Sequence, residues 1–471
     1  MSLKPNKVSL YSYNVYFGDC FLLVFEYEDR NRSVLIDFGS TGKGKPHHGA
    51  AVDDDDETNK ETTGHRLRRV AQHISQVCGE YGLDVVVATH RHKDHIYGFG
   101  LREAGQIILD CKPKIVIQPW TEDPEDNRDL SNKTAAVDAE AFKNDPRKSF
   151  TSMLNDMHLV AESIETEALN LADGEVFKDT IATALKEKIV FAADDNKIKN
   201  KRAVDNLHAM GAAEGGESHY VYYGYDKIDW ETVLPGVNVH ILGPPRIEDS
   251  SEVTSATSTS DEFWSLQAMN QYFWGLQAAT NRTVSHQEGN APLFPRGKTF
   301  TGKRPDNLTW IIRQLRNVRA SQLLQIVRYV DSALNNTSVI MLFEVGDQKL
   351  LFPGDAQIEN WRFVLEKAKS DNALRKLLNE TTLYKVGHHG SRNATPKSLW
   401  DGFEKKITDK RKPEKPLKTV VSTMVGKHGE SPDTAVPLPL MVETMKAESD
   451  FCTTEDLKGD DFFQLIEIPI N

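Results

Sequence analysis

Three histidines and one aspartate lie within six residues of one another, directly after an apolar run. The run is Asp84-Val85-Val86-Val87-Ala88, and the polar residues follow in Thr89-His90-Arg91-His92-Lys93-Asp94-His95. Imidazole nitrogen suits Zn²⁺, Mn²⁺ or Fe²⁺, and a carboxylate adds charge and can position a bound water. With a sharp turn after the strand, His90 and His92 can hold one ion while Asp94 and His95 face a second. Solvated histidines at a strand end are the simpler interpretation, but four such residues so close together favour a metal site.

More ligand-type residues follow predicted strands in the C-terminal part of the chain. These strand ends carry Gly354-Asp355-Ala356, Gly387-His388-His389-Gly390-Ser391 and Gly426-Lys427-His428-Gly429. An aspartate beside a glycine can approach two cations roughly 3.5–4 Å apart without steric cost. We therefore predict that Asp355 bridges two ions, with capping of the following helix as its alternative role. His388 or His389 would complete the second ion, and the other would complete the first ion or donate a proton.

Such a site predicts hydrolysis by a bridging hydroxide. Two ions that share a water lower its pKa and stabilise the charge that develops at a phosphorus or carbonyl centre. No side-chain nucleophile is then needed. The predicted metal ligands are His90, His92, Asp94, His95, Asp355, His388 and His389, and the predicted catalytic residues are Asp94, His389 and His428.

Residues around the predicted ligands each have two candidate roles. Asp37 ends a strand and could accept a hydrogen bond from a ligating imidazole, although capping or turn formation would explain it equally well. His428 could approach the substrate or lie exposed on its loop. The candidate phosphate contacts are Lys385, Arg392 and Lys427, each of which would otherwise be a surface charge.

The predicted elements that position these residues alternate between strands and helices. Strands are predicted over 8–15, 21–25, 34–36, 84–88, 114–119, 220–223, 237–242, 338–344, 349–352, 383–386 and 418–422. Apolar residues at three- and four-residue spacing predict a helix over about 65–81, and a further helix is predicted over about 357–378. We therefore expect an α/β (α+β) fold built of stacked layers.

The central part of the chain differs in character from both ends. Residues 129–203 are charged with helix-like apolar spacing, and residues 248–261 are rich in Ser, Thr and acidic side chains. We predict that residues 1–120 and 336–471 form two halves of one core and that residues 121–335 are an inserted cap over the substrate. Basic stretches at 186–202, 296–319 and 405–418 could bind phosphate or be solvated surface.

Composition indicates a globular protein. The 471 residues are 39% hydrophobic and 27% charged, and the net charge of −12 gives no long-range attraction to nucleic acid. No apolar run approaches the roughly 18 residues that span a bilayer, and the first residues lack a secretion-signal pattern. A cytoplasmic location without a membrane partner is therefore expected. The four cysteines are far apart and predict buried thiols rather than disulfides or a thiolate metal site.

Together these motifs resemble the metallo-β-lactamase superfamily. The resemblance rests on Asp37, His90-x-His92-x-Asp94-His95, Gly354-Asp355-Ala356 and His388-His389-Gly390-Ser391, and it covers about residues 8–120 and 335–470. With Gly18-Asp19-Cys20 entering a strand, the set is similar to the hydrolase domain of bacterial DNA-uptake channel proteins. The resemblance implies an αββα metallo-β-lactamase sandwich with a large insertion, two Zn²⁺ or Mn²⁺ ions and phosphodiester hydrolysis.

The chain departs from the superfamily pattern at one ligand. That pattern has a further histidine between the His-rich turn and the bridging aspartate. The candidates here are His158, His208, His219 and His240, which lie in the predicted insertion without a clear ligand context. The sequence therefore does not identify every ligand of the first ion.

The leading functional prediction is a metal-dependent phosphodiesterase or nuclease, with nucleic acid among its candidate substrates. The same hydroxide would attack a thioester or lactone, so an acyl hydrolase is the second prediction. Basic residues along the cleft would favour phosphate, and an apolar pocket would favour acyl substrates. A metal-stabilised binding module with a protein partner is the third prediction. The sequence does not fix the oligomeric state.

Overall fold

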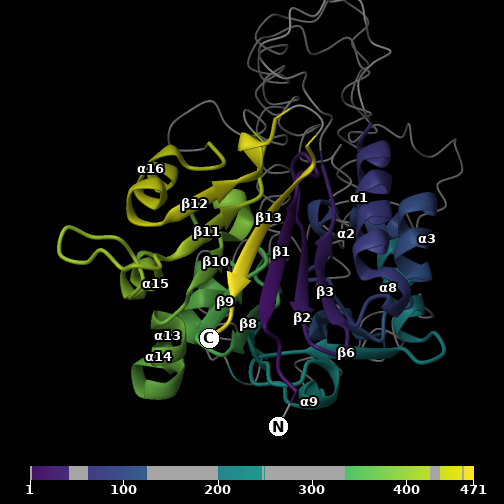
Figure 1. Cartoon of the computed structure of the whole chain (residues 1–471), viewed down its shortest axis with the longest axis horizontal. Coiled ribbons are helices and arrows are strands. Elements are labelled where there is room, and N and C mark those ends of the chain that lie inside the picture. Colours follow the sequence, from purple (N-terminus) through teal and green to yellow (C-terminus); the bar gives the residue numbers. More distant parts are fainter. Residues whose placement is uncertain are drawn as a thin grey trace, which may run out of the picture. The chain divides into compact units, whose positions relative to one another are not determined.

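Two mixed β-sheets form the centre of the structure (Figure 1). The computed structural model describes residues 3–41, 62–124, 200–246, 249, 335–424, 435–458 and 461–471. All of these residues belong to one compact unit. The mixture of helices with two mixed sheets confirms the predicted α/β (α+β) class.

The first sheet has seven strands in the order β13-β1-β2-β3-β4-β5-β6. They are β1 (Lys7–Tyr13), β2 (Cys20–Glu26), β3 (Asn31–Phe38), β4 (Val85–Val87), β5 (Ile115–Pro119), β6 (Glu217–Val221) and β13 (Phe463–Pro469). Neighbours from β13 to β3 are antiparallel, and neighbours from β3 to β6 are parallel. Strand β13 places the C-terminal end of the chain beside β1, with Pro469 opposite Lys7.

The second sheet has six strands in the order β12-β11-β10-β9-β8-β7. They are β7 (Asn238–Gly243), β8 (Ile340–Val345), β9 (Gln348–Phe352), β10 (Leu383–Lys385), β11 (Lys418–Val421) and β12 (Asp450–Thr453). Strands β9 to β12 are parallel, whereas β8 is antiparallel to both β7 and β9. Each sheet therefore has a parallel part, and loops at the carboxyl ends of parallel strands commonly carry functional residues.

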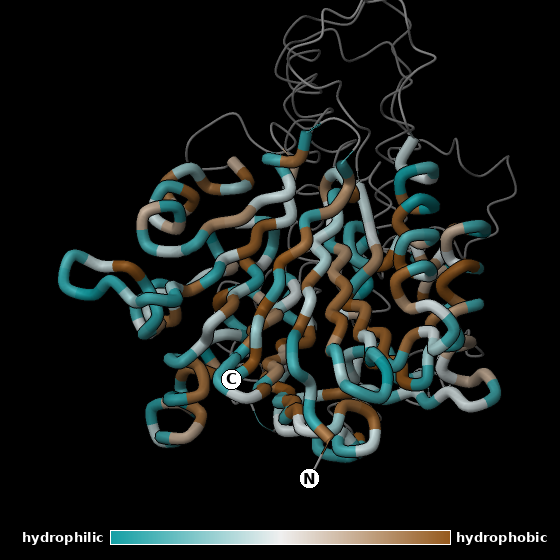
Figure 2. The backbone as a smooth tube through the Cα atoms, in the orientation of Figure 1, coloured by the Kyte–Doolittle hydropathy of each residue, from teal (hydrophilic) through white to brown (hydrophobic). Residues whose placement is uncertain are grey.

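Apolar side chains fill the space between the sheets and cover both outer faces. Between the sheets, the ring centroids of Phe25 and Phe343 are 6.0 Å apart. Apolar residues of α1 (Thr63–Cys78), α2 (Lys93–Gly100), α3 (Arg102–Asp110) and α8 (Lys201–Gly211) pack on the other face of the first sheet. Those of α13 (Ile358–Ser370), α14 (Asn372–Asn379), α15 (Lys397–Gly402) and α16 (Pro439–Glu448) pack on the second. Figure 2 shows hydrophobic residues concentrated along the strands.

The helices follow the predicted apolar spacing, with one interruption. In α1, Leu67, Val70 and Ile74 are buried, and the Thr62 hydroxyl caps the first turn by accepting a hydrogen bond from the N–H of His65. The single helix predicted over 357–378 is two helices, because Asp371 breaks the first. Its carboxylate caps α14 by accepting hydrogen bonds from the next turn's backbone.

Part of the predicted insertion belongs to the sheets. Strands β6 and β7 lie between residues 121 and 335, yet each is an edge strand of a sheet. The structure therefore assigns residues 200–246 to the core and not to a separate cap. Their apolar runs are visible in the sequence, but pairing with β5 and β8 is a long-range contact. Residues 125–199 and 250–334 lie outside the described residues.

The helices and the cysteines of the described residues bear on two further predictions from the sequence. Among the helices of the described ranges, none is both long and apolar enough to cross a membrane. All four cysteines are free thiols. Cys20 and Cys111 are buried as predicted, whereas Cys78 and Cys452 are half-buried.

Candidate metal centre

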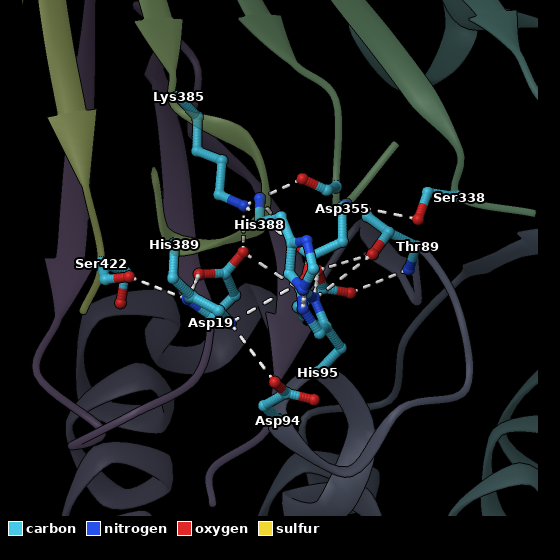
Figure 3. Close-up of polar contacts among 12 residues, drawn as sticks. Asp19, Thr89, Asp94, His95, Ser338, Asp355, Lys385, His388, His389 and Ser422 are labelled. Carbon is cyan, nitrogen blue, oxygen red and sulfur yellow. Dashed lines mark hydrogen bonds and ion pairs between the residues drawn. The ribbon is translucent and has the colours of Figure 1, made fainter. Parts of the chain in front are cut away.

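The ligand-type side chains meet at the carboxyl ends of strands from both sheets (Figure 3). The first sheet and the turn into α2 supply Asp37, His90, His92, Asp94 and His95, and the second sheet supplies Asp355, His388 and His389. Contacts cross from one sheet to the other. Nε2 of His95 lies 3.0 Å from Oδ2 of Asp355, and Nε2 of His389 lies 3.3 Å from Oδ2 of Asp94. Residues far apart in the sequence therefore form one cluster.

Two glycines allow the loops of the cluster to approach one another. Gly18 has a φ of +153°, and a Cβ there would lie 2.7 Å from the carbonyl oxygen of Asp94. Gly354 has a φ of +56°, and a Cβ there would lie 2.8 Å from the Cβ of Thr89. A side chain at either position would push the loops apart, so glycine is required at both.

Asp37 anchors the start of the histidine cluster. Its carboxylate accepts hydrogen bonds from the backbone N–H and the hydroxyl of Thr89, both at 2.8 Å. Its Oδ2 also lies 2.7 Å from Nδ1 of His95, and the Nδ1–H donates to it. Of the two roles that the sequence allowed for Asp37, capping or contact with an imidazole, the structure shows the contact with an imidazole.

His95 and His389 are both fixed through their Nδ1 atoms. Nδ1–H of His95 donates to Asp37, and Nδ1–H of His389 donates to the carbonyl oxygen of Ser422 at 2.8 Å. The other ring nitrogen, Nε2, then faces the carboxylates. This is the tautomer and orientation that a metal-binding histidine needs.

Four buried residues bring their ligand atoms together. The atoms belong to Asp94, His95, Asp355 and His389 and all lie within 4.8 Å of one another. Two imidazole nitrogens with two carboxylates are a donor set that suits Zn²⁺ or Mn²⁺. The described residues therefore contain a buried His and Asp group that could hold a metal ion.

His90 and His92 form a pair next to this group. The rings of His90 and His95 have centroids 4.2 Å apart. Nδ1 of His90 lies 3.2 Å from Oγ1 of Thr89, whose own hydrogen goes to Asp37, so Nδ1–H of His90 is the donor. Nε2 of His90 then faces Nδ1 of His92 at 2.9 Å. These two nitrogens are the atoms through which the pair could share one ion.

Burial and neighbouring charges act together on the ionisation of the centre. Burial and the nearby His95 lower the pKa of His90 well below its usual value, so this ring is neutral at pH 7. Burial also lowers the pKa of His95, but Asp355 and Asp37 outweigh it and raise that pKa well above normal. Burial raises the pKa of Asp355, but His95 and His389 outweigh it and hold the pKa well below normal. The Asp355 carboxylate is thus anionic and favours a cation beside it.

Lys385 is buried within the cluster. Its Nζ forms an ion pair with Asp19, lies 3.5 Å from Oδ1 of Asp355 and donates to the carbonyl oxygen of Gly354 at 3.1 Å. Burial lowers the pKa of Lys385, but Asp19 and Asp355 outweigh it and raise that pKa. The predicted phosphate contact at Lys385 is therefore corrected. With a side chain only 2% exposed, its ammonium is an internal cation for two carboxylates.

The other predicted site residues lie at different places. The backbone N–H of His388 donates to Oδ1 of Asp355, and its Nδ1 lies 2.9 Å from Oγ of Ser391. Among the described residues, the four-residue group contains His389 and not His388. Arg392 is exposed on the turn that follows. The predictions for Lys427 and His428 fall outside the described residues.

The histidines considered for the missing ligand make contacts elsewhere. Nε2 of His208 lies 3.1 Å from the carbonyl oxygen of Glu122, and Nδ1 of His219 lies 3.0 Å from the hydroxyl of Tyr225. His240 pairs with Glu344 across β7 and β8. His158 falls outside the described residues. Of the basic stretches, 405–418 leads into the amino end of β11, whereas Ser422 of the centre follows its carboxyl end.

Sequence reasoning did not assign a site role to Asp19, Thr89 or Ser422. Asp19 stands in the Gly18-Asp19-Cys20 motif, which was a usable signal. The structure shows that Asp19 pairs with Lys385 and that its N–H donates to the carbonyl oxygen of Asp94 at 2.8 Å. Ser422 contributes a backbone atom, for which a sequence carries no signal.

Comparison with models of known protein families found no match to this chain, and a search of curated proteins found none either. The case for a function therefore rests on the geometry of the centre. Oriented imidazoles beside buried carboxylates can bind divalent cations and hold a water molecule between them.

Proposed function

We propose that the chain is a metal-dependent hydrolase with a dinuclear centre and that its reaction is phosphodiester hydrolysis. The proposed enzyme is a phosphodiesterase or nuclease. The observation that carries the proposal is the convergence of the buried ligand atoms of Asp94, His95, Asp355 and His389 within 4.8 Å of one another.

The orientation of the imidazoles supports metal binding over a purely structural cluster. A structural histidine can use both nitrogens for hydrogen bonds to the protein. Here Asp37 and Ser422 take the Nδ1–H groups of His95 and His389, while both Nε2 atoms face carboxylates. Supporting contacts of this kind are typical of metal-bound histidines.

The arrangement of the sheets agrees with the fold that the resemblance implies. Helices pack on the outer faces of two facing sheets, and the centre lies at the carboxyl ends of their parallel strands. We therefore propose the αββα metallo-β-lactamase sandwich as the fold. In that assignment His90 and His92 would hold the first ion, Asp94, His95 and His389 would hold the second, and Asp355 would contribute to both.

The chain's own residues have distinct parts in the proposed reaction. Divalent ions bound there, Zn²⁺ or Mn²⁺, would supply Lewis acidity and a water of lowered pKa. Asp94 and Asp355 would orient that water, because both carboxylates face Nε2 of His389. Nζ of Lys385 lies near Oδ1 of Asp355, whereas His95 lies near Oδ2. The positive charge of Lys385 favours the anionic form of that carboxylate. The side chains of these residues are almost completely buried, which limits access of bulk water.

The choice of a phosphodiester rests on the motif set. Gly18-Asp19-Cys20, Gly354-Asp355-Ala356 and His388-His389-Gly390-Ser391 resemble the hydrolase domain of DNA-uptake channel proteins. Arg392 adds an exposed positive charge directly after the last of these motifs. An exposed cation beside the centre favours an anionic substrate.

Hydrolysis of bis-p-nitrophenyl phosphate tests the proposal. Metal-stripped protein would be reloaded with Zn²⁺ or Mn²⁺ and assayed beside a thioester and a lactone. Phosphodiester cleavage should depend on the metal and be abolished in Asp94→Ala and Asp355→Ala, while Asp401→Ala, at an exposed position of α15, should keep it. Turnover of the acyl substrates alone would replace the proposal with an acyl hydrolase. Full activity in Asp355→Ala would contradict the proposed dinuclear centre.

A further inference from the structure

Asn335 carries a buried amide for which the described residues offer no hydrogen-bond partner. The residue is 0% exposed, and neither Oδ1 nor Nδ2 is paired within the described ranges. Removing an amide from water without replacing its hydrogen bonds is unfavourable. Unpaired buried polar groups are rare in folded chains, and a role in binding an ion is one of their established explanations.

The turn that carries Asn335 is tied to both sides of the metal centre. The carbonyl oxygen of Asn335 accepts a hydrogen bond from the N–H of Ser338, and Oγ of Ser338 accepts one from the N–H of Asp355 at 3.2 Å. The N–H of Val339 donates to the carbonyl oxygen of Thr89, directly before the histidine cluster. Figure 3 shows Ser338, Thr89 and Asp355 together. Ser338 and Val339, which follow Asn335 in this turn, therefore lie between Thr89 and the proposed bridging carboxylate.

The His90 and His92 pair is incomplete as an ion site. Their facing nitrogens are 2.9 Å apart, but in the described residues they join no group of three His, Cys, Asp or Glu ligands. Even with the proposed bridging Asp355, which both ions would share, His90 and His92 supply only two ligands that belong to this ion alone. The described histidines between the two motif regions are engaged elsewhere. Within the described ranges, a further donor for this pair is therefore of another type.

We infer that Oδ1 of Asn335 is a further protein ligand of the ion held by His90 and His92, in addition to the bridging Asp355 of the proposed centre. The inference rests on the proposed dinuclear centre and deepens it. An amide oxygen is a neutral, hard donor, unlike an imidazole nitrogen. Hard oxygen donors suit Mn²⁺ and Mg²⁺, whereas imidazole suits Zn²⁺. An amide oxygen in this position would therefore shift the preference of the first ion toward a hard divalent cation such as Mn²⁺.

Metal binding to Asn335 variants tests the inference without relying on activity. Asn335→Leu removes the amide at similar volume, and Asn335→His supplies an imidazole. Asn336→Ala is the matched control, because that side chain donates to Glu359 on helix α13. Metal-stripped full-length protein would be dialysed against Mn²⁺ or Zn²⁺ and its bound metal measured by mass spectrometry. The control should bind two Mn²⁺ ions, and Asn335→Leu should bind one. In Asn335→His the preference should shift toward Zn²⁺ by about tenfold or more.

The outcomes separate this inference from the proposed function. Two ions bound with unchanged affinity by Asn335→Leu would overturn the role of Asn335 and leave the dinuclear centre in place. Fewer than two ions in the unsubstituted protein would overturn both. If circular dichroism shows that Asn335→Leu does not fold, Asn335→His decides, since an unchanged preference between Mn²⁺ and Zn²⁺ would also overturn the inference.

Discussion

Nδ1 of His95 lies 2.7 Å from Oδ2 of Asp37, and both side chains are buried. Asp37 has a φ of +57°, which is uncommon for a residue other than glycine. Its carboxylate is held in place by two hydrogen bonds from Thr89. Because Asp37 is fixed in this way, it fixes the His95 ring and turns Nε2 toward Asp355. An unfavourable backbone conformation of this kind, retained beside the centre, supports a functional role.

Loss of the Asp37 carboxylate should weaken metal binding. In Asp37→Ala, the His95 ring loses the acceptor that orients it, so affinity for Zn²⁺ or Mn²⁺ should fall by about 10- to 100-fold. Competition with a chelating dye measures the affinity, and circular dichroism checks the fold. Asp401→Ala removes an exposed aspartate and should bind metal as the unsubstituted protein does. An unchanged affinity in Asp37→Ala would contradict this role.

Metal binding should release protons. The carboxylates around His95 and His389 raise the pKa of both imidazoles despite burial. Both rings therefore hold an additional proton at pH values below those raised pKa values. A bound ion would displace the protons, about one to two per chain. Affinity should therefore fall as the pH falls below the raised pKa values. Calorimetry in buffers of different ionisation enthalpy measures the release, and the same apparent enthalpy in every buffer would refute it.

Lys385 and Asp19 should depend on each other for stability. The two buried side chains form an ion pair, so Lys385→Met or Asp19→Asn alone should lower the free energy of unfolding by about 3–5 kcal/mol. The double variant should lose less than the sum, because no charge of this pair is left unpaired. Urea unfolding of the metal-free protein gives the four values. Strictly additive losses would show that the two side chains are not coupled.

Asp84 should stabilise the protein above acidic pH. It accepts hydrogen bonds from Arg30, Lys114 and the N–H of Ser33. Burial raises the pKa of Asp84, but Arg30 and Lys114 outweigh it and lower that pKa. A lowered pKa stabilises the fold above the unfolded value of about 3.9, and this contribution is lost as the pH falls through the folded value.

Unfolding of Asp84→Asn and of the unsubstituted protein at several pH values tests this role of Asp84. At pH 7 the substitution should lower the free energy of unfolding by about 2 kcal/mol, because hydrogen bonds to a charged group are lost. The difference should shrink below about pH 4. Denaturant unfolding measures it at each pH. A difference that stays constant with pH would exclude a charge effect.

Local patterns predicted most of the strands, because buried parallel strands are continuous apolar runs. Val85–Val87 and Ile115–Pro119 are examples. Strand β13 was not predicted. Only Ile466 and Ile468 of β13 are buried, and its partner β1 lies at the other end of the chain. Such pairing depends on the whole fold, as does the assignment of β6 and β7 to the edges of the sheets.

The candidate site was predictable where side chains of unusual type cluster, as in the run from His90 to His95. It was not predictable where the role depends on burial. Lys385 looks like a surface charge in the sequence, and its carboxylate partner Asp19 stands near the other end of the chain. Asn335 likewise carries no signal until its burial is known.

The most direct test of the central claim is anomalous diffraction from crystals grown with Mn²⁺ or Zn²⁺. We expect a peak within about 2.0–2.6 Å of Nε2 of His95 and of His389. A second peak should lie between His90 and His92, with Asp355 in reach of both. Full-occupancy metal elsewhere, with no peak among these residues, would contradict the proposed centre.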